Sequence, residues 1–283
     1  MVRKFFLLAL VFAFINFEPL KVQESESIFF EKFISEVRQE NLEEMSFGEL
    51  VCHIGKKFLG FPYLAGTLEK GIDEQCVVTF EGFDCVTFFE LTLALARITK
   101  TGRTGFPDLV QEVQRSRYRR GKVIDYASRL HYSADWIWDN IAKGLVRDKT
   151  KELGGVPIRF DVNYMSENPD LYSGLKNEPK QIEKIKQVEQ EISERTYYYI
   201  PTVLVSKIES KLKSGDIIFF VLDSGGLDYS HVGICCFEGA EPRLLHSSSK
   251  AGKVILDKKI SEYCKAHKKI KGITIVEPLE PSK

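Results

Sequence analysis

The chain has 283 residues, and its 40 Lys plus Arg balance its 40 Asp plus Glu, so the formal net charge is zero. Nucleic-acid binders draw their affinity from a basic surplus that neutralises phosphates, so this balance argues against a nucleic-acid partner. Hydrophobic residues make up 43% and charged residues 28%, which is ordinary for a globular domain and argues against a protein with many membrane spans.

The first residues differ from the rest. Arg3 and Lys4 precede an apolar run, Phe5 to Phe17, that carries no charge. A basic start followed by about 7–15 apolar residues is the form of a secretory signal peptide, and the run is shorter than the roughly 20 residues that span a bilayer. We therefore expect residues 1–23 to be a signal peptide with a poorly defined cleavage site. The protein is then exported to the periplasm, or tethered to the membrane if the signal is not cleaved.

Helices are predicted in the first two thirds of the chain. Apolar spacing places them within residues 27–58, 86–98, 107–121, 129–145 and 180–195, with a strand over 72–80. Ser46 is a plausible N-cap three residues before Glu49. The basic cluster of Arg115, Arg117, Arg119 and Arg120 is expected on the solvated face of its helix.

The character changes after Pro201. Runs of β-branched and aromatic residues, separated by turn residues, predict strands at 215–223, 230–238, 243–249, 253–258 and 272–278. Helices followed by a series of antiparallel strands predict an α+β fold rather than alternating βαβ units.

Two of the five histidines fall in neighbouring predicted strands. His231 and His246 are symmetric about the junction of Glu238 and Gly239, so a hairpin that turns there places them directly opposite each other. Opposed residues have Cβ atoms about 4.5–5.5 Å apart, which lets one imidazole bond to the other and fix its tautomer. The alternative is a chance meeting of two structural histidines.

Cys85 is the one cysteine of six at the start of a predicted helix. Free backbone N–H groups and the positive end of the helix dipole lower a thiol pKa there, and the same N–H groups can receive an oxyanion. A lone cysteine in this place is more often structural, but a histidine pair elsewhere supplies the base and orienting group of acyl transfer.

The other cysteines suggest no chemistry. Cys235 and Cys236 point to opposite faces of a strand and are expected to be buried free thiols. Cys264 and His267 are expected to be incidental, because no second half of a metal site is visible. Zinc-protease spacing, a serine-hydrolase elbow and a phosphate-binding glycine loop are all missing from the sequence, so we expect no metal and no cofactor.

The order of these motifs carries a resemblance. F-D-C at 83–85 heads a helix, K-S-G-D-I-I-F-F follows at 213–220, S-H-V-G-I stands at 230–234, and a histidine lies on the next strand. In this the chain resembles the NlpC-type branch of papain-like cysteine peptidases, which cleave amide bonds in bacterial cell-wall peptides. The resemblance implies a nucleophile helix packed on an antiparallel sheet. It also implies roles for Cys85 as nucleophile, His231 as base and His246 as the orienting third residue.

A narrower resemblance comes from the long stretch between Cys85 and His231. Its segments 128–140 and 163–172, with G-G-L-D-Y-S-H at 225–231, are similar to a family of N-acetylmuramoyl-L-alanine amidases. Those enzymes separate sugar from stem peptide in soluble muropeptides, including 1,6-anhydro forms. The similarity spans roughly residues 45–278. It implies a single cysteine amidase domain over 24–283, with a mainly helical substrate-recognition insertion at about 101–200.

Aromatic residues crowd one part of that insertion. His131, Tyr132, Trp136 and Trp138 lie close together, and aromatic faces with polar tips suit sugar rings. Residues two apart on a helix cannot face the same way, so we expect one tryptophan to be buried and the other to lie nearer the cleft. The predicted substrate-binding residues are Tyr63, Asp84, His131, Tyr132, Trp136 and Ser230, with Arg129 and Asn140 as either polar partners or structural residues.

Three functions stay open at this point. The first is hydrolysis of the amide between N-acetylmuramic acid and L-Ala through a Cys-His-His triad and a thioester. The second moves the cut to the bond between γ-D-Glu and diaminopimelate. The third is a non-catalytic peptidoglycan-binding module. The expected partner is a muropeptide or peptidoglycan fragment, with no nucleic acid and no membrane contact beyond the signal; the oligomeric state is open, with a monomer as the expectation.

Overall fold

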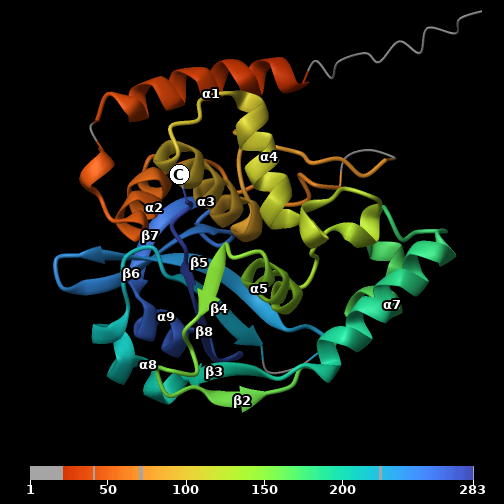
Figure 1. The fold of residues 1–283 in the computed structure, drawn as a ribbon. Coiled ribbons are helices and arrows are strands. Elements are labelled where there is room, and N and C mark those ends of the chain that lie inside the picture. Colours follow the sequence, from red (N-terminus) through yellow and green to blue (C-terminus); the bar gives the residue numbers. More distant parts are fainter. Residues whose placement is uncertain (1–21, 41, 70–72, 223–224, 283) are drawn as a thin grey trace, which may run out of the picture.

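The computed structural model describes residues 22–40, 42–69, 73–222 and 225–282 (Figure 1). The predicted signal segment lies almost entirely outside these ranges. Within them, no helix is both long enough and apolar enough to cross a membrane.

Helices form the first half of the fold, as predicted. They are α1 (Val22–Arg38), α2 (Phe47–Lys56), α3 (Cys85–Lys100), α4 (Phe106–Arg117), α5 (Ser133–Ala142), α6 (Tyr164–Glu167) and α7 (Pro179–Glu194). The N-cap at Ser46 is confirmed, because its side chain accepts from the Glu49 N–H and the Glu49 carboxylate accepts from the Ser46 N–H in return. Helix α3 is buried on nearly all sides, packed between α2, α4 and the sheet.

The second half forms the sheet. All five predicted strands are present as β4 (Ile217–Leu222), β5 (Tyr229–Glu238), β6 (Glu241–Ser248), β7 (Lys253–Lys259) and β8 (Ile270–Pro278). They pair antiparallel in the order β8-β4-β5-β6-β7. A layer of helices on an antiparallel sheet confirms the α+β prediction.

Side-chain alternation divides the sheet into two apolar faces. One face packs on α2 and α3 and includes Phe219, Val232 and Cys236. The other packs on α8 (Thr202–Ile208) and α9 (Ile260–Ala266) (Figure 1). This second face includes Phe220 and Cys235. Successive strand residues point to opposite faces, so the adjacent cysteines enter different cores.

The two cysteines also differ in chemistry. Cys235 is a buried free thiol, as predicted, but Cys236 forms a disulfide with Cys52 of α2, with Cα atoms 5.7 Å apart. The prediction of a free thiol at Cys236 is therefore wrong. Its cause is the face on which Cys236 lies, which is the one that α2 covers.

The segment 101–200 is only partly helical. It contributes three short strands, β1 (Val146–Asp148), β2 (Val156–Ile158) and β3 (Tyr197–Pro201), of which β1 and β3 pair with β8. The loop before β5 is tied to the first turn of α5, because the buried Asp228 carboxylate accepts from the Ala134 N–H at 2.6 Å. The segment is thus joined to the sheet on two sides.

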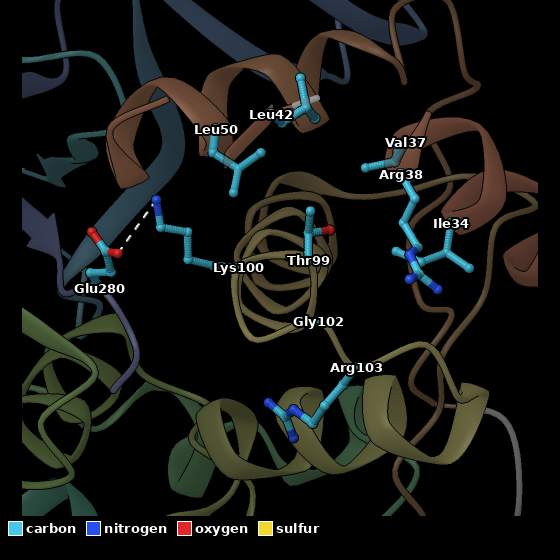
Figure 2. A pocket seen from close by; sticks show the side chains of 10 residues that line it. All are labelled: Ile34, Val37, Arg38, Leu42, Leu50, Thr99, Lys100, Gly102, Arg103 and Glu280. Atoms are coloured by element: carbon cyan, nitrogen blue, oxygen red, sulfur yellow. Dashed lines mark ion pairs between the residues drawn. The ribbon is translucent and has the colours of Figure 1, made fainter. Parts of the chain in front are cut away.

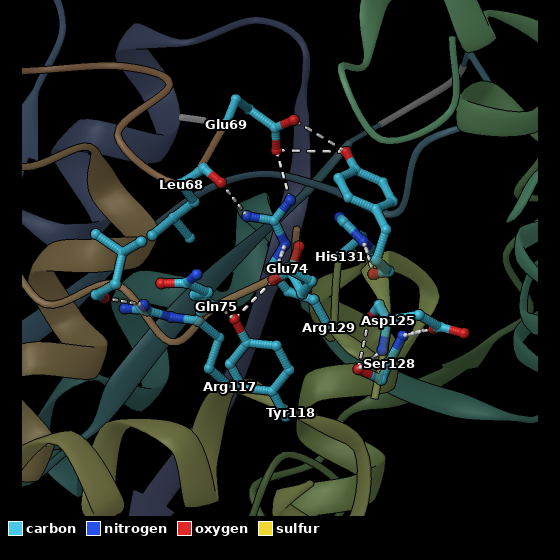
Figure 3. Close-up of polar contacts among 12 residues, drawn as sticks. Leu68, Glu69, Glu74, Gln75, Arg117, Tyr118, Asp125, Ser128, Arg129 and His131 are labelled. Carbon is cyan, nitrogen blue, oxygen red and sulfur yellow. Dashed lines mark hydrogen bonds and ion pairs between the residues drawn. The ribbon is translucent and has the colours of Figure 1, made fainter. Parts of the chain in front are cut away.

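The strand predicted over 72–80 is wrong, because its described residues, 73–80, adopt no strand. Side chains of α4 and its C-terminal end take the backbone acceptors that a neighbouring strand would use. The Arg117 guanidinium donates to the Val77 carbonyl, and the Tyr118 hydroxyl is bonded to the Gln75 carbonyl (Figure 3). Arg117 is therefore buried, paired with Glu90, and not on a solvated face as predicted.

Candidate active site

Cys85 is the first residue of α3, as predicted. The preceding Asp84 is the N-cap, and its Oδ1 accepts from the Val86 N–H at 3.0 Å and from the Thr87 N–H and hydroxyl at 2.7 and 2.8 Å. The approach to the helix is held by a parallel bridge between Phe83 and Tyr63. The nucleophile candidate thus stands on a capped helix end rather than on a loose loop.

The Cys85 thiol is protonated at neutral pH. Burial raises its pKa to about 12, the charge of Asp84 adds to the rise, and the N–H groups of Val232, Cys85 and Val86 act in the opposite direction. The expected lowering by the helix end is therefore wrong, because desolvation outweighs the backbone donors. The contact with the Val232 N–H places the sulfur beside β5, the strand that also carries His231.

The histidine pair forms, but in a different register from the predicted one. In the pairing of β5 with β6, Glu238 lies opposite Glu241 and Ile234 lies opposite Leu245. The same register puts His246 opposite Gly233, which is two positions along β5 from His231. The rings still meet, with His231 Nε2 and His246 Nδ1 2.6 Å apart and the ring planes at 84°. A diagonal pair is within reach of long and aromatic side chains.

Gly233 makes room for this diagonal contact. A Cβ added there would lie 2.7 Å from Leu244 Cδ1 and 3.0 Å from His246 Cβ, so any larger residue would push the imidazole aside.

Both imidazoles are neutral. Phe220 and Tyr263 stack on His231, and burial lowers the pKa of His231 to about 3; repulsion from a protonated His246 would act in the same direction. His246 is 1% exposed, and burial lowers its pKa to about 4 against the opposing effect of Asp257. A neutral thiol beside a neutral imidazole suits general-base activation of the sulfur at the moment of attack.

Three of the predicted substrate residues border this group. Tyr63 is half-buried, and burial raises its pKa together with the charges of Cys85 and Asp84, which places its hydroxyl near both. Ser230 is exposed, and its hydroxyl donates to the Phe220 carbonyl at 3.3 Å. Contact of Tyr63, Asp84 and Ser230 with substrate stays a prediction.

Tyr132 and Trp136 are core residues, and the prediction that they contact substrate is wrong. Trp136 is 2% exposed, donates from Nε1 to Glu90 Oε1 at 3.0 Å and packs against Phe89. Tyr132 is 3% exposed and donates to Glu189 Oε1 at 2.7 Å. Aromatic rings with a polar tip satisfy a core as well as a sugar.

The other tryptophan lies at the surface. Trp138 is 50% exposed, with the Arg195 guanidinium 4.8 Å above its ring. The prediction that one of the two tryptophans is buried is confirmed for Trp136, and the prediction that the other lies nearer the cleft stays a prediction for Trp138.

His131 borders an acidic region that sequence reasoning missed. Its Nε2 donates to the Tyr126 carbonyl at 2.8 Å, its ring lies 4.4 Å from that of Tyr126, and burial lowers its pKa to about 3. Nearby, a cavity of about 540 Å³ is lined by Leu68, Glu69, Asp73, Glu74, Asp125, Tyr126 and other residues.

The charge of this acidic cavity is partly balanced from within. Arg129 is buried and donates to Glu69 at 2.6 Å (Figure 3). Tyr126 and Ser173 also donate to the Glu69 carboxylate. Arg129 and Asn140 are both buried, the latter bonded to the Ser116 and Trp136 carbonyls. Both are structural residues in this fold.

A second cavity lies at the opposite end of α3. It measures about 410 Å³ and is lined by Arg38, Thr99, Lys100, Arg103 and Glu280 among others, with Lys100 Nζ 3.4 Å from the Glu280 carboxylate (Figure 2). Since α3 begins at Cys85 and ends at Lys100, the helix rise separates this cavity from the thiol by roughly 22 Å. It is not part of the candidate catalytic site.

In the part of the chain that the structure describes, no group of three or more His, Cys, Asp or Glu side chains is arranged so that it could hold a metal ion. Cys264 and His267, the pair considered in the sequence as half of a metal site, have separate surroundings. His267 Nδ1 donates to the Tyr263 carbonyl at 2.8 Å, and Cys264 is a buried free thiol.

Comparisons with known proteins identify the family. The family model described as AmiA-like, N-acetylmuramoyl-L-alanine amidase-like, matches residues 53–273. An N-acetylmuramoyl-L-alanine amidase structure from Bacteroides uniformis is 33% identical, covers 83% of this chain and 99% of its own, and has a TM-score of 0.77. A Bacteroides fragilis structure whose name suggests a xylanase is 35% identical, with 80% and 99% covered and a TM-score of 0.74.

A Legionella pneumophila protein at 22% identity, covering 92% of this chain and 97% of its own with a TM-score of 0.70, shares the fold. No curated protein sequence matches the chain. The family match covers most of the chain and includes Cys85, His231 and His246. The chain therefore belongs to the N-acetylmuramoyl-L-alanine amidase-like family.

Proposed function

We propose that the protein hydrolyses the amide between N-acetylmuramic acid and L-Ala of muropeptides, 1,6-anhydro forms included, with Cys85, His231 and His246 as catalytic triad. The observation that carries this proposal is the half-buried thiol at the start of α3, held against the strand whose His231 is bonded to a second histidine. Thiol, base and orienting group are the parts that acyl transfer requires.

The hydrogen bond between the two histidines supports one proton path. His231 Nε2 is hydrogen-bonded to His246 Nδ1. The other ring nitrogen, His231 Nδ1, therefore receives the thiol proton as Cys85 Sγ attacks the lactyl carbonyl carbon. The backbone N–H of Cys85, the first of α3 and outside the helical ladder, stabilises the oxyanion. As the C–N bond breaks, His231 passes the proton to the departing amine of L-Ala, which leaves a thioester.

Water then completes the cycle. His231 Nδ1 takes a proton from the water that attacks the thioester, and the C–S bond breaks. The same proton returns to the sulfur, which restores the neutral thiol and imidazole. Two neutral groups at rest fit this sequence, since each step moves one proton between sulfur, His231 and the reacting nitrogen or oxygen.

The choice of the sugar–peptide amide rests on family membership rather than on an aromatic wall, because Tyr132 and Trp136 are buried. A xylanase-type reaction fits the site less well. Glycosidases generally use two carboxylates flanking the bond, whereas Cys85 is accompanied by two imidazoles. The papain-like, NlpC-type core is part of the same proposal, supported by the nucleophile helix α3 packed on β5 and β6.

We also propose that the protein acts after export, as a periplasmic enzyme. The disulfide between Cys52 and Cys236 supports an oxidising compartment, since structural disulfides are rare in cytosolic proteins. The basic and apolar start of the chain points the same way.

Digestion of defined muropeptides, read by mass spectrometry, tests the function. Release of free sugar and intact stem peptide supports the amidase, whereas a disaccharide-dipeptide product favours the γ-D-Glu–diaminopimelate endopeptidase. Binding without turnover by the wild-type protein indicates the non-catalytic module. Cys85→Ala removes the nucleophile, and Cys76→Ser, which changes another free half-buried cysteine, is the matched control.

A further inference from the structure

One nitrogen of the histidine pair has no partner. His246 Nε2 is buried and makes no hydrogen bond with any described residue. The nearest carboxylate oxygen recorded for it is Asp257 Oδ2, 3.6 Å away, on the adjacent strand β7. A buried imidazole nitrogen left without a partner is rare and calls for a physical reason.

The proposed mechanism requires a particular tautomer of His246, and this tautomer explains what the unpaired Nε2 does. His231 must present an unprotonated Nδ1 to the thiol, so its proton sits on Nε2 and is donated to His246 Nδ1 across 2.6 Å. His246 must then carry its own proton on Nε2. That N–H points at Asp257, where a carboxylate can only accept.

We propose that Asp257 is a positioning residue of this site: its carboxylate accepts the His246 Nε2–H and so holds His246 in the tautomer that makes His231 a base. The inference rests on the proposed Cys85–His231–His246 mechanism and adds a fourth member to it. Asp257 acts through His246 and touches neither sulfur nor substrate.

The surroundings of Asp257 suit this role. Its main chain is held by Arg243, whose Nε donates to the Asp257 carbonyl at 2.8 Å, and its Oδ1 accepts from the Lys258 N–H at 2.7 Å. Oδ2 is the oxygen that faces His246. Hydrogen bonds of catalytic groups are often long without substrate and tighten on binding, so 3.6 Å is a distance from which this one can close.

The remaining groups around His246 cannot replace Asp257. From α9, Tyr263 covers the imidazole edge-on at 78°, with ring centres 5.4 Å apart. His267 also lies near, but its charge opposes protonation of His246, and its Nδ1 is used by the Tyr263 carbonyl. Asp257 is the group whose charge favours a proton on His246.

The wild-type enzyme provides the first test. With ¹⁵N-labelled histidine, two-bond nitrogen–proton correlations distinguish the Nε2–H from the Nδ1–H tautomer. We expect His246 as the Nε2–H form and His231 as the Nε2–H form at pH 7. An Nδ1–H tautomer at His246 overturns the proposal, and this result needs no variant to fold.

Asp257→Asn gives the second test. The Asn amide can donate to His246 Nε2 and so favours the tautomer of His246 that carries its proton on Nδ1. This Nδ1–H then donates to His231 Nε2, which moves the proton of His231 to its own Nδ1. We expect kcat on a defined muropeptide to fall about 100-fold with KM nearly unchanged, the lower range of what general-base catalysis contributes. Asp257→Glu should recover part of the loss, because it restores an acceptor.

Asp161→Asn is the matched control, since Asp161 is exposed and lies outside the site. Turnover of Asp257→Asn within two-fold of this control contradicts the proposal. A fall in kcat that comes with a lower melting temperature, while the tautomers of His231 and His246 stay as in the wild type, assigns Asp257 a structural role. This result also contradicts the proposal.

Alkylation of Cys85 separates this inference from the proposed function. The rate of reaction with iodoacetamide at pH 7 depends on His231 accepting the thiol proton and needs no substrate. If wild-type protein cleaves no muropeptide, the amidase proposal fails, yet slower alkylation of Asp257→Asn than of Asp161→Asn still supports the positioning role. Equal alkylation rates count against that role whatever the substrate.

Discussion

The start of α3 and the aromatic cluster of segment 128–140 differ in how strongly local chemistry restricts the role of their side chains. Backbone chemistry and strand alternation predict the site at the start of α3, and the structure bonds His231 to His246 and sets Cys85 against the strand of His231. The aromatic cluster of the inserted segment was inferred from composition, and the structure buries Tyr132 and Trp136. A helix end constrains what a thiol there can do, whereas an aromatic ring serves a core and a ligand site equally well.

Removal of the nucleophile is the strongest way to break this comparison. Cys85→Ala should lower muropeptide turnover about 10⁴-fold or more, because the thioester cannot form. Circular dichroism and melting temperature should stay close to wild type. Retained turnover would show that the α3 end is as structural as Tyr132.

The disulfide between Cys52 and Cys236 tests how firmly α2 is held on β5, the strand that carries His231. It closes a loop between positions 184 apart, and reduction or Cys52→Ala should lower the free energy of unfolding by roughly 5 kcal/mol, the chain-entropy value for a long loop. Urea denaturation with and without reductant measures this. An unchanged midpoint would mean that α2 is held on β5 by packing alone.

The two tryptophans sharpen the other side. Trp136→Ala should cost about 3–5 kcal/mol of unfolding free energy, since it empties a core position and leaves Glu90 without its indole partner. Trp138→Ala at the exposed position should cost less than ~0.5 kcal/mol. Denaturant melts compare the pair. A raised KM for Trp138→Ala with unchanged stability would restore a substrate role to this cluster.

The smallest expected effect concerns the pH dependence of the Cys85 alkylation rate, which should lack the step of an ordinary histidine. Burial lowers the pKa of His231 to about 3, so its imidazole is neutral at every pH above about 4. The rate of Cys85 alkylation should therefore show no step near pH 6.5, where an ordinary histidine titrates, and should rise further only as pH approaches the thiol pKa of about 12. A step near pH 6.5 would indicate a solvated histidine and a more open site.

Much of the fold was predictable because long elements carry their own periodicity. Helices α2, α4, α5 and α7 and strands β4 to β8 all show it, and the structure confirms them. Strands β1, β2 and β3 were not predicted, since three to five residues are too few for a pattern and they exist through pairing with β8 or with each other.

The hairpin register shows where local reasoning ends. The symmetric spacing of the two histidines predicts a turn at Glu238–Gly239, whereas the observed pairing centres on Gly239 and Ala240, with Gly239 at φ 58°. A glycine with positive φ suits the first central position of a tight hairpin turn. This shift of one residue in the turn moves the partner of His246 by two positions, to Gly233, and the imidazoles meet diagonally.

Local sequence patterns encode the chemical inventory of this protein: a thiol at a helix start, two histidines on adjacent strands, and an α+β order of elements. These follow from periodicity, capping and alternation, which act over a few residues. Tertiary structure decided which groups meet and which are buried. It paired Cys236 with Cys52, buried Arg117 with Glu90, raised rather than lowered the Cys85 pKa, and set Asp257 beside His246. Those outcomes depend on desolvation and on partners far away in the chain, which no local pattern encodes.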